Sequence, residues 1–316
     1  LSVSSKATGF VALIVLLTKV FESSGQSWGV ILAIVAGATM TLGNLVALQQ
    51  TNPVRLLAYS SISQAGFIIA PLAVSGITGN YQDGIFASVT YLIIYAFMNI
   101  GAFLSVHLFT NFTKSDNFYE WGGIAKHSPL AAVLTTVFFF SLAGIPPLGG
   151  WFAKFVVFRS LLSTGEIIGI SLAIVGAINA VIALVYYARI SKVIWMDELK
   201  NPEEEKLFEF QSPLKVVGAL TVLITFVAGI FPGIFSYLGE VSSIFFGKKG
   251  SAIDGLAHPI KSSVPDFICL TITSGLVNRP TPTIGLEVSF LIPVTSSNCA
   301  ASSLKRDGPE QSSHAP

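Results

Sequence analysis

The stretch "SLAGIPPLGGWFAKF", residues 141–155, lies within an apolar run and contains residues that disrupt a helix. Proline has no backbone N–H to donate, and it disfavours the helical conformation in the residue before it. Glycine readily adopts backbone angles outside the helical region. We therefore expect a broken helix, and the break is formed by three glycines and two prolines: Gly144, Pro146, Pro147, Gly149 and Gly150.

The composition of the chain is that of a membrane protein. Hydrophobic residues make up 52% of the 316 residues and charged residues 11%, and the mean hydropathy is +0.71. Soluble domains average about 25% charged residues. The net charge of +1 gives no basic surface for nucleic acid. We therefore expect a lipid bilayer as the surroundings and no nucleic-acid partner.

Motifs for cofactors are absent from the sequence. It contains no glycine-rich nucleotide-binding motif of the Rossmann or P-loop type and no HExxH zinc motif. The two cysteines, Cys269 and Cys299, have no partner at a spacing typical of metal ligands. We therefore expect no cofactor and no metal ion bound to this chain.

Seven stretches are apolar enough to cross a bilayer, for which a helix needs roughly 20 residues. They cover about residues 3–21, 28–48, 55–78, 84–109, 129–162, 166–190 and 213–238. The connecting segments, such as "QQTNP" and "SGITGNYQDG", are rich in polar and turn-forming residues. The predicted fold is an all-α polytopic membrane protein with about seven transmembrane helices, one of them discontinuous.

The composition changes at Gly247. From there to Pro316, serine, threonine and proline alternate with short mixed runs, and no stretch is long enough to cross a membrane. We expect residues 247–316 to form an atypical, disordered tail. At the other end the chain starts at Leu1, without a basic leader or a cleavage motif, which indicates a fragment of a longer protein.

The broken stretch allows two topologies, one interrupted crossing or a hairpin of two short helices. Lysines and arginines near the span ends distinguish them, because such residues accumulate in cytoplasmic loops. A hairpin would divide the basic residues between the two sides, whereas with a single crossing the outer side holds chiefly Lys19, Arg159 and residues 248–249. We therefore expect one interrupted crossing. Its cytoplasmic side then holds Arg55, Lys114, Lys126, Arg189, Lys192, Lys200, Lys206 and Lys215.

Lys154 lies four residues past Gly150, about one helical turn into the second half-helix. Irregular backbone at membrane depth is tolerated only where it packs in protein or lines a wet cavity, and discontinuous helices mark transport sites. Burial and the positive end of the second half-helix would both disfavour the charged form of Lys154, which suits a residue that binds and releases protons. The alternative is a lysine whose ammonium group extends to the interface.

Other polar residues fall within the predicted spans. Lys6 lies near the start of the first span, where a proton relay and a lysine reaching the interface fit the sequence equally well. Tyr186, Tyr187 and Arg189 are interpreted as an anchor at the membrane interface. Serine and asparagine often join helices structurally, but several polar residues could also form a hydrogen-bonded path. The candidates for this path are Asn44, Tyr59, Ser60, Ser63, Gln64, Asn99 and His107.

Five motifs together resemble one protein family. They are "LSVSSKA", "LGNLVALQQTNPVRLLAYSSISQAGF", "YAFMNIGAF", "SLAGIPPLGGWFAKF" and "VYYARI". In this order, over about residues 1–240, they are similar to the C-terminal half of the antiporter-like subunit N of bacterial respiratory complex I. Its counterparts are subunit 2 of the mitochondrial enzyme and the B-type subunit of the plastid enzyme. The "SLAGIPPLGG" element is shared by related antiporter-like proteins, whereas the run from Asn44 to Gly66 points to subunit N.

The resemblance implies a division of the chain. The family has fourteen spans that include two inverted five-helix repeats, and this chain would begin at the eighth span. Residues 1–27 would then be span eight, 28–195 the second repeat, and 196–246 a cytoplasmic loop with the last helix. The glutamate and lysine of the first half-channel would lie outside this chain, so we expect the fragment alone not to pump protons. The tail has no counterpart in the family.

The resemblance also implies a function. Lys6 corresponds to the lysine that links the two half-channels, and Lys154 to the lysine of the outlet half-channel. The chain would be a subunit of a proton-translocating NADH-quinone oxidoreductase, assembled with other membrane subunits. Quinone, FMN and iron–sulfur clusters would be bound by partner subunits and not by this chain. The expected location is the bacterial inner membrane or, alternatively, the thylakoid membrane.

Two other functions are compatible with the sequence. A subunit of a multi-component sodium/proton antiporter would share the broken helix and its lysine, but it would not be coupled to quinone chemistry. In a membrane scaffold without transport activity, the lysines would only pair with acidic residues.

Overall fold

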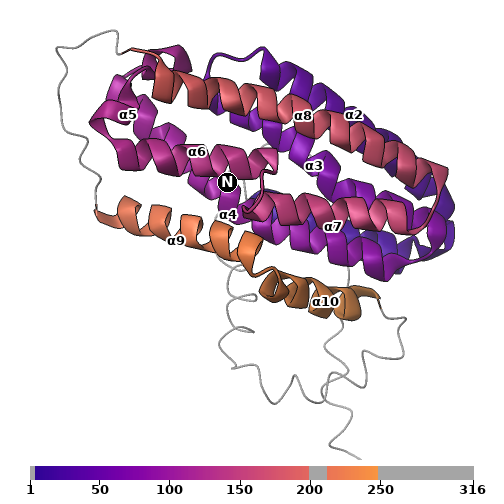
Figure 1. Ribbon diagram of the computed structural model, residues 1–316. Coiled ribbons are helices and arrows are strands. Elements are labelled where there is room, and N and C mark those ends of the chain that lie inside the picture. Colours follow the sequence, from indigo (N-terminus) through magenta and orange to yellow (C-terminus); the bar gives the residue numbers. More distant parts are fainter. Residues whose placement is uncertain (1–3, 199–211, 248–316) are drawn as a thin grey trace, which may run out of the picture. The chain divides into compact units, whose positions relative to one another are not determined.

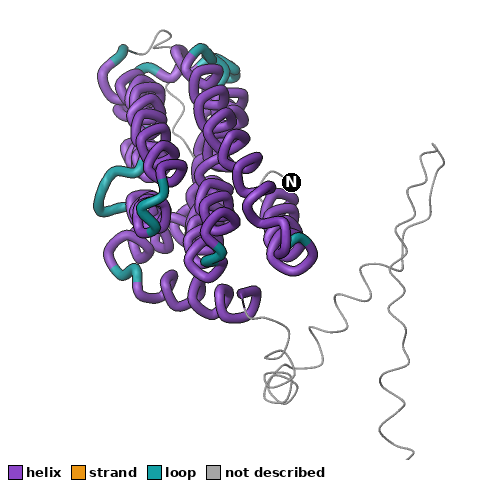
Figure 2. Tube along the Cα trace, turned by 90° about the vertical axis from the view of Figure 1, so that its right-hand side faces the viewer, coloured by secondary structure: helices purple, strands orange, loops and turns teal. Residues whose placement is uncertain are grey.

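The described part of the chain forms a series of helices. The computed structural model describes residues 4–198 and 212–247, and their regular structure is entirely helical (Figures 1 and 2). The predicted tail, apart from Gly247, lies outside the described residues. The elements are α1 (Ser4–Val15), a π-helical turn (Leu16–Val20), a 3-10 turn (Glu22–Ser24), α2 (Gly25–Leu48), α3 (Pro53–Thr78), α4 (Tyr81–Thr113), a second 3-10 turn (Phe118–Trp121), α5 (Ile124–His127), α6 (Pro129–Ala143), α7 (Gly149–Ser163), α8 (Ile167–Met196), α9 (Ser212–Ile230) and α10 (Gly233–Gly247).

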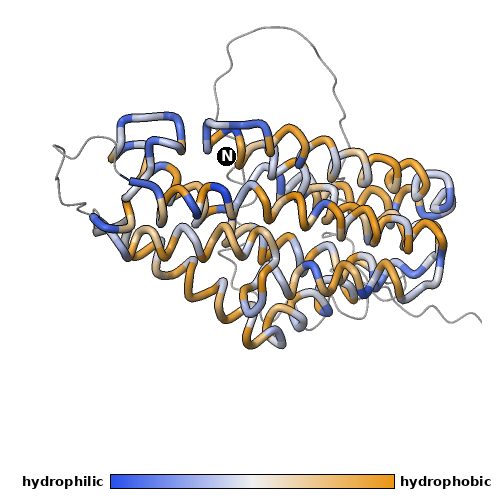
Figure 3. The backbone as a smooth tube through the Cα atoms, turned by 45° about the horizontal axis from the view of Figure 1, so that its top comes forward, coloured by the Kyte–Doolittle hydropathy of each residue, from blue (hydrophilic) through white to orange (hydrophobic). Residues whose placement is uncertain are grey.

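Four described helices are long and apolar enough to cross a membrane. They contain the second, third, fourth and sixth predicted spans. Hydrophobic residues predominate along these helices, and hydrophilic residues gather in the connections (Figure 3). The all-helical, polytopic fold class is therefore confirmed. The four segments are Glu22–Leu48, Pro53–Thr78, Tyr81–Thr113 and Ile167–Met196.

The first and last predicted spans differ from continuous apolar helices. The first changes from α-helix to π-helix at Leu16 and ends at Val20, so it is short. The last is bent by 83° between α9 and α10. The bend occurs at Pro232, whose nitrogen cannot donate to the preceding turn, and Gly233 follows it directly. The prediction of one continuous helix over 213–238 was wrong.

The broken stretch forms two half-helices, α6 and α7, that lie one after the other along α4. Gly101 of α4 approaches the ring of Phe138 in α6. Earlier in α4, Ile94 contacts the position of Gly149 at the start of α7. Since α4 passes α7 first and α6 second, the two half-helices continue in one direction, antiparallel to α4.

The contacts of α8 also show that α6 and α7 continue in one direction. Its early residue Gly169 lies against the Leu161 carbonyl of α7. Near its end, Trp195 Nε1 donates to Thr136 Oγ1 of α6 at 2.9 Å. Figure 1 shows α6 and α7 following one another beside α8. This arrangement agrees with a single interrupted crossing and not with a hairpin.

Helices α2 and α3 pack closely because glycines form their contact. A Cβ on Gly29 would lie 2.8 Å from the Ala73 carbonyl oxygen, and one on Gly66 would lie 2.7 Å from that of Ala36. Small residues allow such close approach of helices in a membrane. The apolar window of α3 is 72% buried, the largest share among the four long helices. Side chains of α3 can therefore reach α1, α4, α7 and α8 inside the bundle.

Candidate functional site

The break begins with a glycine that ends α6. Gly144 has a φ of +99°, in the left-handed region, and its N–H donates to the Phe140 carbonyl at 3.0 Å. Ile145 N–H donates to the same oxygen at 3.0 Å, which completes a glycine-dependent helix cap. In a continuous helix, the carbonyls of Leu142 and Ala143 would accept from residues 146 and 147. Both of those residues are prolines, so the two carbonyl oxygens receive no backbone bond there.

Lys154 supplies the missing donors. Its Nζ lies 3.1 Å from the carbonyl oxygen of Leu142 and 2.5 Å from that of Ala143. The side chain is only 5% exposed. Lys154, 12 residues after Leu142, therefore caps the C-terminal end of α6, where the prolines provide no backbone donors. The alternative of a lysine that extends to the interface does not describe this side chain.

The dipole acting on Lys154 differs from the expected one. From its position in the first turns of α7, the positive helix end should oppose its charge. Instead the side chain points back to the C-terminal end of α6, which carries partial negative charge and stabilises a cation. The ring of Phe67 adds a contact, with Nζ 5.3 Å from the ring centroid. The protonated lysine is thus held by carbonyl dipoles and an aromatic face.

Gly144 also makes room for this lysine. A Cβ at Gly144 would lie 2.8 Å from Cδ of Lys154. Any larger residue would meet this contact in addition to the strain of a positive φ. The glycine is therefore required twice, for the backbone turn and for the path of the lysine side chain.

The break is enclosed by protein. Gly150 N–H donates to Ser141 Oγ at 3.1 Å, and this hydroxyl donates to Met98 Sδ of α4. Gly229 of α9 contacts the backbone at Pro147, with no space for a Cβ. The irregular backbone is thus packed between α4 and α9, as expected for such a segment at membrane depth.

Gln64 of α3 joins the lysine site to α4. Its Nε2 donates to the Leu142 carbonyl at 3.2 Å, so this oxygen accepts from both Gln64 and Lys154. The hydroxyl of Tyr91 donates to Gln64 Oε1. Because Tyr91 holds the oxygen side of the amide, the NH₂ side is directed toward the break.

Lys6 of α1 bonds to α3 about one turn away from Gln64. Its Nζ donates to Ser61 Oγ at 2.5 Å, and Ser61 lies three residues before Gln64 on α3. Residues three apart on a helix are neighbours on its surface. Helix α3 therefore carries a partner of Lys6, Ser61, one turn before Gln64, which shares the Leu142 carbonyl with Lys154.

A second polar cluster lies between α2, α3 and α8. Tyr187 shares a hydrogen bond of 2.6 Å with Ser60, and Tyr186 donates to Asn44 Oδ1 at 3.0 Å. Asn44 Nδ2 donates to Asn179 Oδ1 at 3.0 Å. Both tyrosines are fully buried. The prediction that they anchor the chain at the membrane interface was wrong, because they belong to the interior of the bundle.

Arg189 closes the end of α2. Its Nη2 donates to the Gln50 carbonyl at 3.1 Å, and its guanidinium carbon lies 5.0 Å from the ring centroid of Phe118. The arginine thus neutralises the negative end of α2 and stacks on the loop that precedes α5. This role is structural.

Four residues of the predicted path stand apart from the lysines. Ser63 is buried against Gly43 of α2, and Tyr59 is half-buried on α3. Asn99 is buried, and its Nδ2 atom has no hydrogen-bond partner among the described residues. His107 lies on an exposed face of α4 and bonds Asn111 at 2.9 Å. None of the four contacts Lys6 or Lys154 through a hydrogen bond in the described part of the chain.

The described residues contain no group of three or more His, Cys, Asp or Glu side chains that could hold a metal ion. Cys269 and Cys299 lie outside the described residues. Two residues of the site were not predicted from the sequence. Tyr91 bonds Gln64, and the ring of Phe67 contacts Lys154. The only signal for Tyr91 is its spacing in an apolar helix, four residues before Tyr95.

Comparisons of the sequence identify related proteins. A family model described as "NADH:quinone oxidoreductase/Mrp antiporter, TM" matches residues 1–182. The chain is 40% identical over 243 residues to NAD(P)H-quinone oxidoreductase subunit 2 of a Synechococcus species, covering 75% of this chain and 44% of that protein. It is 33% identical over 249 residues to NADH-quinone oxidoreductase subunit N of Desulforamulus reducens, covering 79% and 50%. The chain therefore spans about half the length of the curated relatives it matches.

Solved structures share the fold. A chain of the Mrp complex from a Dietzia species matches with a TM-score of 0.63 at 20% identity, covering 74% of this chain and 50% of that one. A chain of respiratory complex I from Thermus thermophilus with bound NADH matches with a TM-score of 0.58 at 19% identity, covering 72% and 46%. With the broken helix, its buried lysine and the family match in agreement, this chain belongs to the NADH:quinone oxidoreductase/Mrp antiporter transmembrane family, as a homologue of complex I subunit N.

Proposed function

We propose that the chain is part of a proton-translocating membrane subunit of a complex I-type quinone oxidoreductase, in which Lys154 and Lys6 carry protons. The observation that carries this proposal is the environment of Lys154. It is a buried lysine with no carboxylate within 4 Å among the described residues, held by two carbonyls at the break of a helix. A cation that served only to neutralise an acid would have that acid beside it.

The shared carbonyl allows Lys154 to change its charge without leaving an unpaired group. When Lys154 is protonated, it donates to the carbonyls of Leu142 and Ala143. When it has lost a proton, its amine retains two N–H donors and gains a lone pair. The Leu142 oxygen keeps the bond from Gln64 in either state. The break therefore stays hydrogen-bonded while the lysine exchanges protons.

Lys6 is the second proton carrier in this proposal. Its Nζ donates to the Ser61 hydroxyl, which in turn donates to the Ala58 carbonyl at 2.6 Å. A hydroxyl can donate and accept, so it is suited to pass a proton between groups. From Ser61 the proposed route continues one helical turn along α3 to Gln64, which bonds the same carbonyl as Lys154. In this scheme the cluster around Tyr186 supports the bundle and carries no proton.

The proposed complex supplies what this chain does not hold. Quinone, FMN and iron–sulfur clusters belong to partner subunits, and neighbouring antiporter-like subunits pack against this one in the membrane. The bacterial inner membrane is the proposed location, and the thylakoid membrane is the alternative suggested by the Synechococcus relative. The relatives at 33–40% identity are named as quinone oxidoreductase subunits, whereas the likeness to the Mrp complex at 20% identity concerns the fold alone.

Proton uptake into membrane vesicles that contain the complete complex tests the proposal. Uptake should depend on quinone reduction and should be lost with Lys154→Ala, while the assembled complex remains present. Uptake that requires a sodium gradient and is indifferent to quinone reduction would favour the antiporter function. Unchanged uptake in Lys154→Ala would contradict a role of this lysine in either kind of transport.

A further inference from the structure

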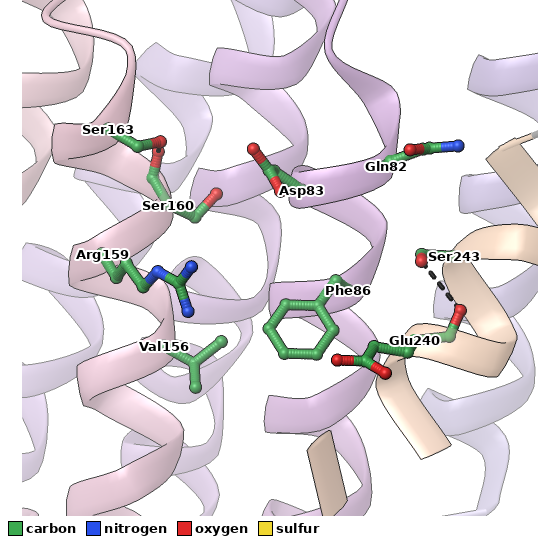
Figure 4. A pocket seen from close by; sticks show the side chains of 9 residues that line it. All are labelled: Gln82, Asp83, Phe86, Val156, Arg159, Ser160, Ser163, Glu240 and Ser243. Carbon is green, nitrogen blue, oxygen red and sulfur yellow. Dashed lines mark hydrogen bonds between the residues drawn. The ribbon is translucent and has the colours of Figure 1, made fainter. Parts of the chain in front are cut away.

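A polar cavity lies away from the lysine site, between α4, α7 and α10. Its volume is about 230 Å³. Figure 4 shows side chains from the three helices pointing toward this space, with the ring of Phe86 between the charged groups. Its polar lining consists mainly of Gln82, Asp83, Arg159, Ser160, Glu240 and Ser243.

The charges of this cavity are not neutralised by ion pairs within residues 4–198 and 212–247. Each of the three helices supplies one charged group, Asp83 from α4, Arg159 from α7 and Glu240 from α10. No ion pair within 4 Å joins Arg159 to either carboxylate in the described part of the chain. Asp83 accepts a hydrogen bond from Asn80 Nδ2 at 2.7 Å. Among the described residues, the cavity thus presents one cation and two carboxylates that form no ion pair with one another.

The cavity lies at one end of the membrane-spanning helices. Asp83 is in the first turn of α4, which begins at Tyr81, and Arg159 is about one turn before the end of α7 at Ser163. Transmembrane helices end at the level of the lipid headgroups. The charged groups therefore lie where phospholipid phosphates and amines are found.

An exposed apolar stripe adjoins the cavity on α10. The opposite face of this helix is packed against the bundle, with Phe235 only 6% exposed, and Gly239 lies against Thr90 of α4. Glu240 and Ser243 of the same helix line the cavity. A polar cavity bordered by an apolar helix face matches a molecule with a charged head and apolar chains. The stripe consists of Ile234, Tyr237, Leu238, Val241, Ile244 and Phe245, each 42–65% exposed.

We infer that this cavity binds the headgroup of a zwitterionic aminophospholipid, phosphatidylethanolamine. Its phosphate bonds to Arg159, whose guanidinium matches phosphate oxygens in geometry and charge. Its ammonium group donates to Asp83 and Glu240 on the other sides of the cavity. The acyl chains extend along the stripe of α10. The two carboxylates disfavour a purely anionic headgroup, because such a headgroup has no cation to pair with them.

Native mass spectrometry of the full chain tests this inference. The protein is released from nanodiscs that contain equal amounts of phosphatidylethanolamine, phosphatidylcholine and phosphatidylglycerol, and the retained lipids are counted. Phosphatidylethanolamine should be retained about tenfold over the other two, because a quaternary amine donates no hydrogen bond and glycerol carries no cation. Equal retention of the three lipids, or preference for phosphatidylglycerol, would overturn the inference.

Substitutions locate the binding. Arg159→Gln and Glu240→Gln should each reduce the preference for phosphatidylethanolamine about tenfold, as expected when a hydrogen bond to a charged group is lost. Arg55→Gln and Asp116→Asn remove exposed charges elsewhere and should leave the preference unchanged. Circular dichroism shows whether each variant keeps its helices. If a cavity variant does not fold, the contrast between lipids in the unchanged chain still decides the question.

A soluble headgroup separates a lipid site from a site for small zwitterions. Phosphoethanolamine added at millimolar concentration should displace the lipid only weakly, since it lacks the chains that contact α10. Displacement at the same concentration as a short-chain lipid would show that the stripe contributes nothing, and the lipid assignment would fail. The readout is binding, so these results do not depend on whether the chain carries protons.

Discussion

Lys154 Nζ lies 3.1 Å from the carbonyl oxygen of Leu142, although the two residues belong to different halves of the broken helix. The prolines that interrupt the helix and the lysine that follows them therefore act together, because the lysine donates to the carbonyls that the prolines leave without a backbone donor. Without Pro146 and Pro147, the carbonyls at the end of α6 would be bonded by the backbone. Without Lys154, they would be buried with fewer donors, at a cost of about 1–3 kcal/mol for each unsatisfied group.

The close contact of Gly150 with α6 gives a test of the packing. A Cβ at this position would overlap the Ser141 carbonyl oxygen, so Gly150→Ala should lower the free energy of unfolding by about 1–3 kcal/mol. Gly37→Ala is the matched control, because its Cβ would meet only Leu172 Cδ2, at 3.8 Å. Thermal unfolding in detergent measures both. Equal melting temperatures for the two variants would show that α6 and α7 are not packed as described.

The bond between Tyr91 and Gln64 predicts energetic coupling. Tyr91→Phe and Gln64→Leu each remove this bond, at about 1 kcal/mol in stability. The double variant should cost less than the sum of the two by at least about 0.5 kcal/mol, since the bond is lost only once. Tyr91→Phe combined with Asn52→Ala, which removes the N-cap of α3, should be additive. Additivity in both pairs would argue against the bond.

Two neighbouring serines separate conduction from structure. Ser61 accepts the bond from Lys6, whereas Ser60 bonds Tyr187 in the other polar cluster. Ser61→Ala should slow proton uptake by the assembled complex on the order of tenfold, because Lys6 loses its hydroxyl partner. Ser60→Ala should lower stability but leave the rate of uptake per complex within about twofold. The reverse pattern would assign conduction to the tyrosine cluster.

Topology is tested by labelling single cysteines in a version in which Cys269 and Cys299 are replaced by serine. Asp116→Cys lies after α4, at the end of the bundle where basic residues accumulate, and should be labelled from the cytoplasmic side. Thr164→Cys lies between α7 and α8 and should be labelled only from the opposite side. A membrane-impermeant maleimide applied to right-side-out and inverted vesicles distinguishes them. Labelling of both residues from one side would favour a hairpin.

Hydropathy predicted most of the fold because four spans are long, uninterrupted apolar helices. The bend at Pro232 was missed for the opposite reason, since apolar residues continue on both sides of it and the sum over the window remains high. Proline and glycine close together in the sequence were the same signal that predicted the break at Pro146. Its meaning depends on whether neighbouring helices hold the two halves in line, and a single sequence does not contain that information.

The site was predictable only in part. The position of Lys154 follows from its distance to the break, but its direction depends on which carbonyls are unpaired and on the space that Gly144 leaves. The tyrosines of α8 were misplaced because the helix continues to Met196, more than two turns beyond Tyr187. Their hydroxyls thus lie inside the bundle, where Ser60 and Asn44 bind them.

Replacing Lys154 with arginine tests most directly whether this lysine exchanges protons. Arginine keeps the positive charge and can still donate to the carbonyls of Leu142 and Ala143, but it does not release a proton near neutral pH. Lys192→Arg, at an exposed position of α8, is the control for the effect of a lysine-to-arginine substitution as such. The measurement is proton uptake per quinone reduced, in vesicles with equal amounts of assembled complex. We predict that Lys154→Arg assembles normally and loses nearly as much uptake as Lys154→Ala, while full uptake with arginine would contradict the relay and leave Lys154 as a structural cap of α6.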